Sequence, residues 1–144
     1  MEITNPRARF DYEILDTWRA GIILTGAEVK AVRAGSMSLK GAYIIIHNEE
    51  IFLINAHIGH YAKAIQKNYE PTHSRKLLLH KKEIKRLIGL TKQKGLTLVP
   101  LKVYTEHNKL KLEFGIGRGR TKIDKRAVIK KRDIDKDIKM AFSS

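Results

Sequence analysis

Two neighbouring stretches of the chain alternate apolar and polar side chains with the two-residue period of a β-strand. The apolar positions of these stretches are Val99, Leu101, Val103, Leu110, Leu112, Phe114 and Ile116. The residues between them, Glu106 to Asn108, are polar and typical of a tight turn. Because alternation places one face of each strand in a core, the pattern predicts an antiparallel hairpin and a chain that is mainly β.

Four further strands are predicted, which makes six in total. Residues 9–16 alternate in the same way, residues 21–25 form a short strand, and the apolar runs 42–46 and 51–56 form a second hairpin, which we expect to be central. Pro100 predicts a bulge or an edge position. Six strands with short turns favour a small antiparallel closed barrel, since closure removes exposed edges, with an open sheet packed by a helix as the alternative.

Glycines and capping residues indicate where helices begin and end. The spacing after Gly26 predicts a short helix that ends at Gly35, and Ser74 is a candidate cap for a longer helix that ends at Gly89. Residues 127–144 form a basic tail whose apolar stripe is narrow, so we expect it to be poorly ordered alone and helical when bound. The expected organisation is a single domain over residues 1–126 followed by this tail.

Positive charge is concentrated in the second half of the chain. The 144 residues carry a formal charge of +14, yet residues 1–70 are neutral, and the excess divides into +8 over residues 71–117 and +6 over residues 118–144. Such an excess implies a polyanionic partner, either nucleic acid or an anionic membrane surface. The basic loop 117–122 places small residues between cations and is either a phosphate-contacting loop or a solvated charged turn.

Aromatic side chains are further candidates for contacts with nucleic acid, because every base offers a face for stacking. The candidates are Tyr12, Trp18, Tyr43, Tyr61, Tyr69 and Tyr104. For any one of them, packing in the core or at its rim is the commoner explanation.

Other classes of function have little support in the sequence. No apolar run is long enough to span a membrane, no secretory leader pattern is present, and the tail lacks a broad apolar face, so we expect a cytoplasmic protein. His57 and His60 stand three residues apart without a third metal ligand, so no metal and no cofactor are predicted. A metal-dependent nuclease built on these histidines and Glu28 is the enzyme alternative. Composition and patterning therefore predict a non-enzymatic protein that binds a polyanion.

Five motifs occur in a fixed order along nearly the whole chain. They are Asn5-Pro6-Arg7-Ala8-Arg9 followed by Asp11-Tyr12, GAEVKAVRAG from Gly26 to Gly35, SRKLLLHKKEI from Ser74 to Ile84, KGLTLVPL from Lys94 to Leu101, and GRGRTKIDKR from Gly117 to Arg126. In order and spacing the chain resembles the SmpB family (small protein B, SsrA-binding protein) of bacterial trans-translation. The resemblance implies a closed barrel related to the oligonucleotide-binding (OB) fold, with about three helices around it and no catalytic activity.

The resemblance also implies partners. Members of the family bind the tRNA-like domain of transfer-messenger RNA (SsrA) and deliver it to stalled ribosomes, where the basic tail enters the empty mRNA channel and becomes helical. The expected partners are therefore transfer-messenger RNA, small-subunit RNA at the decoding centre and mRNA channel, and elongation factor Tu indirectly through the aminoacylated RNA, with the protein acting as a monomer. A general ribosomal or structured-RNA-binding protein is the alternative.

Site residues follow from the resemblance by position. Contacts with the body of the RNA are implied for Asn5, Arg7, Arg9, Glu28, Lys30, Arg33, Arg75, Lys76, Leu78 and His80. Contacts of the basic loop are implied for Arg118, Arg120, Lys122, Lys125 and Arg126, and those of the tail with the ribosome and mRNA channel for Lys130, Lys131, Arg132, Lys136 and Lys139. For Glu28 and Arg33, an ion pair that holds the turn and helix together is an equal alternative.

Four positions depart from the family pattern. Phe10 stands where the family usually has His, and Arg19 stands where it usually has an acidic residue. Thr121 replaces a lysine of the usual Gly-Lys-Lys stretch, and Ile123 replaces His or an aromatic residue. These departures leave open whether the family's contacts with RNA are kept at the four positions.

Overall fold

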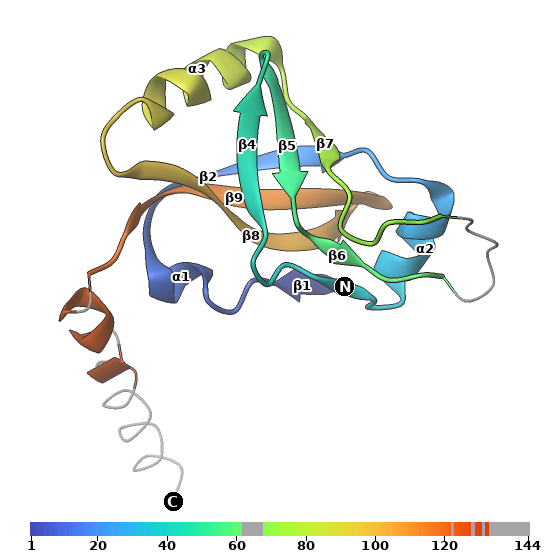
Figure 1. The fold of residues 1–144 in the computed structure, drawn as a ribbon, viewed down its shortest axis with the longest axis horizontal. Helices are drawn as coiled ribbons and strands as arrows, with labels where there is room; N and C mark the ends of the chain where they lie inside the picture. The colour runs from blue at the N-terminus through green and yellow to red at the C-terminus, as the bar shows by residue number, and fades with distance from the viewer. Residues whose placement is uncertain (62–67, 122, 128, 131, 133–144) are drawn as a thin grey trace, which may run out of the picture.

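The chain folds around one strongly curved antiparallel sheet of seven strands, in the order β1-β8-β9-β2-β7-β5-β4 (Figure 1). The computed structural model describes residues 1–61, 68–121, 123–127, 129–130 and 132. The sheet strands are β1 (Glu2–Thr4), β2 (Tyr12–Ile22), β4 (Tyr43–His47), β5 (Glu50–Ile54), β7 (Arg75–Leu78), β8 (Leu96–Glu106) and β9 (Lys109–Gly119). A separate antiparallel pair is formed by β3 (Met37–Ser38) and β6 (His57–Ile58).

Helical segments lie around this sheet. The helices are α1 (Ala8–Asp11), α2 (Gly26–Arg33) and α3 (Lys81–Thr91), and residues 123–127 are helical as well. The predicted helix after Gly26 is confirmed as α2, which ends where Gly35 adopts a φ of +83°. Because left-handed backbone is favourable for glycine, Gly35 ends the helix as the sequence indicated.

The long hairpin predicted from the alternation of residues 99–116 is confirmed as β8 and β9. His107 and Asn108 form its turn with φ values of 49° and 62°. The register passes from Pro100 opposite Phe114 to Lys102 opposite Glu113, so Leu101 is the extra residue of a bulge. The bulge expected at Pro100 is therefore present, and it lies inside the long hairpin.

The predicted strand over residues 9–16 begins too early. Residues 8–11 form α1. A hydrogen bond from the Asp11 backbone N–H to the Arg7 carbonyl closes this helix, and the side chains of Arg7 and Asp11 form an ion pair of 3.3 Å. The strand then runs without a break from Tyr12 to Ile22, so the two expected strands are one, with a register shift between Ile14 and Asp16. Local pairing four residues apart overrides the alternation in this segment.

The helix predicted from Ser74 to Gly89 is wrong at both ends, because it begins later and continues past Gly89 to Thr91. Residues 75–78 form β7, with Arg75 and Leu77 buried and Lys76 and Leu78 exposed, which is the two-residue period of a strand. Pairing on both sides, with β2 and β5, fixes this segment in the sheet. The helix begins only after His80, whose backbone N–H donates to the Glu83 carboxylate.

The six-stranded closed barrel is corrected as well. The hairpin of residues 42–56 forms β4 and β5 as expected, but β4 lies at one end of the sheet rather than at its centre, and β1 lies at the other end. Figure 1 shows β4 crossing β8 instead of running beside it. Because crossed strands cannot share a hydrogen-bond ladder, their contact is made by side chains and the seven-stranded sheet stays open.

The main core lies inside the curve of the sheet. Its fully buried side chains include Ile51, Leu53, Val103, Leu112 and Phe114. The α3 helix contributes Ile84 and Leu87 to this core, and α2 contributes Ala31 and Val32. A second, small cluster of Ala8, Val99 and Leu101 fixes α1 against β8. Apolar packing therefore holds α1 and α2, which are the helices that carry predicted RNA contacts.

Candidate nucleic-acid interface

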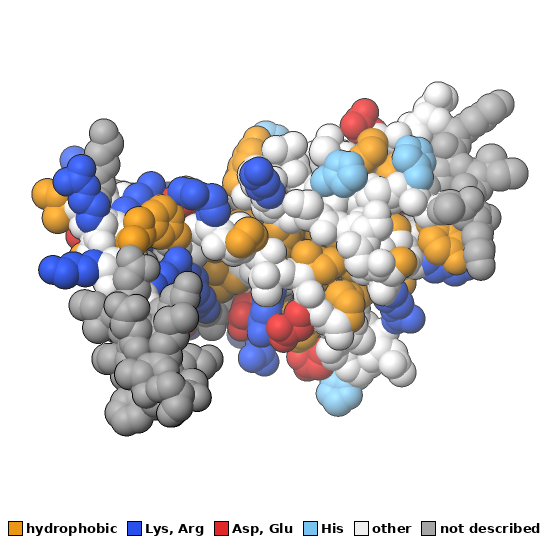
Figure 2. Space-filling model, turned by 90° about the horizontal axis from the view of Figure 1, so that it is seen from below, with side chains coloured by type: hydrophobic (Ala, Val, Ile, Leu, Met, Phe, Trp, Pro, Cys, Tyr) orange, Lys and Arg blue, Asp and Glu red, His pale blue; other side chains and the backbone are white. Residues whose placement is uncertain are grey.

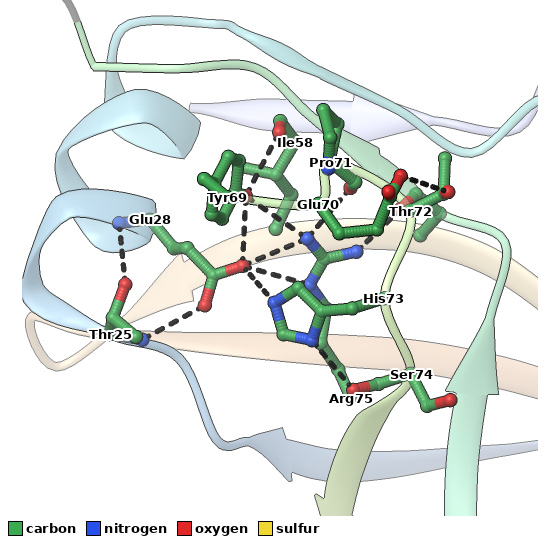
Figure 3. A network of polar contacts seen from close by, with 11 residues as sticks. Thr25, Glu28, Ile58, Tyr69, Glu70, Pro71, Thr72, His73, Ser74 and Arg75 are labelled. Carbon is green, nitrogen blue, oxygen red and sulfur yellow. Dashed lines mark hydrogen bonds and ion pairs between the residues drawn. The ribbon is translucent and has the colours of Figure 1, made fainter. Parts of the chain in front are cut away.

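Glu28 and Arg75 form a buried ion pair at the start of α2 (Figure 3). Both residues are 1% exposed, and the Arg75 Nε and Nη2 atoms donate to Glu28 Oε2 at 3.0 and 2.8 Å. The other carboxylate oxygen, Oε1, accepts a hydrogen bond of 3.0 Å from the Thr25 backbone N–H, while Thr25 Oγ1 accepts one of 3.2 Å from the Glu28 backbone N–H. Glu28 thus caps its own helix and neutralises Arg75.

Arg75 also joins this helix to the segment that precedes β7. Its guanidinium donates to the carbonyl oxygens of Ala56 at 2.5 Å and Pro71 at 2.8 Å. Tyr69 donates its hydroxyl to Glu28 Oε2 and to the Ile58 carbonyl, each at 3.0 Å as alternative partners. These contacts fix α2, β6 and residues 68–74 relative to one another.

The carboxyl group of Glu28 stays charged although it is buried. Burial works to raise the pKa of Glu28, but hydrogen bonds from the Thr25 backbone, Arg75, His73 and Tyr69 outweigh burial and lower the pKa to about 2. His73 contributes through its Nε2 atom, which lies 2.9 Å from Glu28 Oε2. A charged, fully paired carboxylate of this kind is a structural element rather than a catalytic base.

Two predictions need correction, namely the RNA contacts of Glu28 and Arg75 and the alternative ion pair between Glu28 and Arg33. Glu28 and Arg75 are too deeply buried to touch an RNA laid on this surface, so their place in the RNA-binding motifs has a structural explanation. The alternative ion pair between Glu28 and Arg33 is wrong, because Glu28 pairs with Arg75. Arg33 is exposed and its Nη2 donates to the Asn108 carbonyl at 2.8 Å.

An exposed surface with cationic side chains lies next to this network, and we call it the β7 face. It comprises two adjoining hollows of about 320 and 310 Å³ that share Gly21, Leu78 and Lys111. Leu78 is 52% exposed, which is unusual for a large apolar side chain within a sheet. The surrounding side chains are Arg19, Arg33, His80, Glu83 and Lys109. Cations around an exposed apolar side chain suit the phosphates and bases of RNA.

Two other predicted contacts have partners of their own within the protein. Lys30 is exposed on α2 and lies 5.6 Å from the centroid of the Tyr61 ring. Lys76 is exposed on β7 and pairs with Glu50 at 2.8 Å. Both side chains point outward, so neither position is excluded from an RNA surface.

A second group of predicted residues meets around α1, and we call it the α1 face. It consists of Arg7, Arg9, Phe10, Asp11, Arg120, Lys125 and Arg132. The cationic groups of Arg7, Lys125 and Arg132 lie 4.9, 5.7 and 5.9 Å from the centroid of the Phe10 ring. Phe10, which replaces the usual His, is therefore a platform for cations.

Asp11 supports the same group of cations. Its carboxylate pairs with Arg7 at 3.3 Å and with Lys125 at 3.2 Å. Burial works to raise the pKa of Asp11, but hydrogen bonds from Arg7 and Lys125 hold it below its usual value. The Asp11 carbonyl also accepts from the Arg120 backbone N–H at 2.9 Å. The α1 helix thus holds the segment that leaves β9.

The basic loop divides between strand and turn. Gly117 is buried in β9, where an added Cβ would lie 3.1 Å from Tyr12 Cβ, so close packing explains this glycine rather than access for phosphates. Arg118 and Arg126 are exposed. Thr121 Oγ1 donates to Asp124 at 2.8 Å and accepts from the Asp124 backbone N–H, which caps the helical residues 123–127. The departure at Thr121 is therefore a helix cap.

Some predicted tail residues can be placed and others cannot. Lys130 and Arg132 are helical and exposed. Lys122, Lys131, Lys136 and Lys139 lie outside the described residues. The predictions for these four positions and for the order of the tail beyond residue 132 therefore stay predictions. Figure 2 shows Lys and Arg side chains gathered at the end of the molecule that carries α1 and the C-terminal segment.

The arrangement of the histidines gives no support to a metal-dependent nuclease. His57 is exposed on β6, and the His60 ring meets the Tyr69 ring edge to face at 4.9 Å. Among the described residues, no group of three or more His, Asp or Glu side chains is placed to hold a metal ion. Within the same part of the chain, no helix is long and apolar enough to cross a membrane.

Sequence reasoning missed several residues of these sites. Lys109 and Lys111 line the β7 face, and the polar positions of the predicted hairpin were the signal that could have found them. Tyr69 and His73 complete the shell around Glu28, but they are 41 and 45 residues away in sequence. No local pattern indicates pairing over such a separation.

The fold and these surfaces define a small basic β protein in which a buried polar network supports two exposed cationic faces, and such faces are the electrostatic footprint of a nucleic-acid-binding protein. The family model described as SmpB protein matches residues 2–144. SsrA-binding proteins of Magnetococcus marinus and Shouchella clausii are 50% and 47% identical over 90% and 96% of this chain, and over 86% and 88% of their own lengths. The chain belongs to the SmpB family.

A solved structure agrees with this assignment. The chain resembles one described as "tmRNA-SmpB: a journey to the center of the bacterial ribosome", with a TM-score of 0.69 and 44% sequence identity. The similarity covers 89% of this chain and 94% of that chain. Fold and sequence therefore lead to the same family.

Proposed function

We propose that the chain is an RNA-binding adaptor that binds the tRNA-like domain of transfer-messenger RNA and delivers it to stalled ribosomes for trans-translation. The observation that carries this proposal is membership of the SmpB family over residues 2–144, with relatives named SsrA-binding proteins. The protein acts by positioning one RNA on another and carries out no chemical step.

The two cationic faces divide this task. The β7 face binds the tRNA-like domain, because its hollows combine an exposed apolar side chain, Leu78, with the cations Arg33 and Lys111. The α1 face is continuous with the segment that begins the tail, and it faces ribosomal RNA. Arg7 and Arg9, which the resemblance assigned to the body of transfer-messenger RNA, are thereby reassigned to the ribosome. The buried pair of Glu28 and Arg75 holds α2 and β7 so that the first face keeps its shape.

Finer features belong to the same proposal. Residues 1–126 form the RNA-binding domain, and residues 127–144 enter the empty mRNA channel as a helix. The open curved sheet is related to the OB-fold, which is itself a partly open barrel. The protein works in the cytoplasm as a monomer and meets elongation factor Tu indirectly, through the aminoacylated RNA.

Competition binding at near-physiological salt tests the main proposal. The full chain should bind transfer-messenger RNA at least about tenfold more tightly than a structured RNA of equal length, because nonspecific phosphate contacts alone do not discriminate. Equal affinity for the two RNAs would contradict the proposal. It would favour the general ribosomal or structured-RNA-binding alternative, which predicts sedimentation with translating ribosomes whether or not they are stalled.

A salt series locates the site. The double change Arg33→Ala and Lys111→Ala should weaken binding and reduce the slope of log K against log salt by about 0.7 to 0.9 for each lost phosphate contact. Lys92→Ala is the matched control, since this exposed lysine lies at the end of α3 and outside both hollows. An unchanged slope in the double variant would contradict the assignment of the β7 face.

A further inference from the structure

We propose that a groove beside α1 receives a single unpaired nucleotide of a bound RNA. The groove has a volume of about 690 Å³ and lies where α1, the start of β4 and the bulged part of β8 meet. Its lining includes Asn5, Arg7, Tyr12, Lys40, Tyr43 and Pro100. The volume is in the range of small-molecule sites. The inference rests on the proposed function, because it requires an RNA on the α1 face.

The floor of the groove is apolar. Leu98, Val99 and Pro100 are buried, and they belong to the bulged segment of β8. The side chain of Asn5 is fixed above this floor, since its Nδ2 donates to the Pro100 carbonyl at 3.0 Å. An amide also has a second N–H and a carbonyl oxygen, which are the atom types that pair with a base edge. The floor thus offers an apolar contact with one oriented polar group.

Tyr43 supplies an aromatic face at the rim. It is the first residue of β4, at the end of the sheet, and its side chain is 50% exposed. Other aromatic candidates have structural roles: the Tyr69 hydroxyl binds Glu28, and Trp18 packs against the main core with Arg86 over its ring. A half-exposed ring beside an apolar hollow is suited to stacking with a base.

The positive charge of the rim favours a nucleotide, which carries phosphate, over an uncharged apolar ligand. Arg7 and Lys40 both line the groove, and the acidic group there, Asp11, is paired with Arg7 and Lys125 at 3.3 and 3.2 Å. The exposed side chain of Arg9 continues this positive surface along the α1 face. The phosphates on either side of an inserted base would therefore meet cations.

Photo-crosslinking identifies the occupant and its source. The full chain carrying p-azidophenylalanine at position 43 is irradiated with transfer-messenger RNA and, separately, with stalled ribosomes. We expect a crosslink to one or two nucleotides that are unpaired in the RNA, and the arm in which it forms shows which RNA supplies them. Crosslinks confined to paired nucleotides or to protein, or no crosslink in either arm, would overturn the inference.

Affinity measurements on the same two RNA targets test the stacking contact. Tyr43→Ala should weaken binding to the target that crosslinks by at least about fivefold, while Tyr43→Phe, which keeps the ring, should bind within about twofold of the wild type. Ile45→Ala is the matched control, because Ile45 is also on β4, is 41% exposed and is outside the groove lining. Equal loss in Tyr43→Ala and Ile45→Ala would overturn the inference.

Failure of the groove and failure of the proposed function give different results. A wild-type chain that binds transfer-messenger RNA specifically, together with a Tyr43→Ala variant that binds both targets normally, overturns the groove alone. A wild-type chain that binds neither target overturns both. Thermal denaturation of each variant confirms folding, and because Tyr43 is half exposed we expect a melting temperature close to that of the wild type.

Discussion

At the scale of single residues, Glu28 and Arg75 determine whether α2 and β7 stay together. Removing the charge of one partner leaves the other buried and unpaired, which typically destabilises a protein by about 3 to 5 kcal/mol. We expect Glu28→Gln to lower the free energy of unfolding in urea by an amount near this range, since glutamine keeps the shape but not the charge.

Lys76 provides the matched control for this change. It is adjacent to Arg75 in β7 and also forms an ion pair, at 2.8 Å with Glu50. Both members of this pair are exposed to water. Exposed pairs contribute about 0 to 1 kcal/mol, so Lys76→Ala should change the free energy of unfolding little. Equal destabilisation by Lys76→Ala and Glu28→Gln would contradict the structural role of the buried pair.

The lowered pKa of Glu28 has a consequence for stability against acid. The pKa is about 2 in the folded chain and 4.5 in its ordinary state, so Glu28 contributes stability above pH 4.5 and loses it as the pH falls toward 2. A difference of this size corresponds to about 3 kcal/mol. The free energy of unfolding should therefore fall more steeply between pH 5 and pH 2.5 in the wild type than in Glu28→Gln. Parallel pH profiles would contradict this expectation.

At the scale of elements, sequence patterns found those structures whose determinants are local. The alternation in β8 and β9 and the glycine after α2 were sufficient, because each reports on neighbouring residues. Sequence patterns missed β7, because this basic segment lies directly before a helix. Only pairing with β2 and β5, which come from other parts of the chain, fixes it as a strand. The resemblance only proposes the site residues, and among them burial separates Arg75 from Lys76.

The α1 helix is the element that contacts the segment leading into the tail and holds it against the domain. Phe10→Ala removes the ring near which three cationic groups lie, and each such contact is worth about 0.5 to 1 kcal/mol at an exposed site. Amide hydrogen exchange at Lys125, whose N–H donates to the Thr121 carbonyl, should become several-fold faster. Phe10→His restores the residue usual in the family and keeps a ring, so exchange should stay near the wild-type rate. Unchanged exchange in Phe10→Ala would show that the ring does not hold this segment.

At the scale of the whole molecule, the charge of the chain serves two separate surfaces on one scaffold. The residues that line the hollows of the β7 face are different from those that line the groove beside α1. The neutral first 70 residues still provide Arg7, Arg9 and Arg33 to these surfaces, while the excess of the second half adds Lys111 and the tail. Net charge along the sequence therefore indicates the class of partner, and the fold determines which cations lie side by side.

Separating binding from delivery is the test that belongs to this scale. A chain that ends after Arg126 keeps every strand, the β7 face and the helical cap at Thr121, so it should bind transfer-messenger RNA within about twofold of the full chain. Peptide tagging on stalled ribosomes should nevertheless be lost, because the proposed ligand of the mRNA channel is missing. The double variant Arg33→Ala and Lys111→Ala should lose affinity for the RNA first, and its tagging should recover when the RNA is raised to saturating concentration. If truncation instead weakens RNA binding as much as it weakens tagging, the tail is part of the primary RNA site and the division between the two faces is wrong.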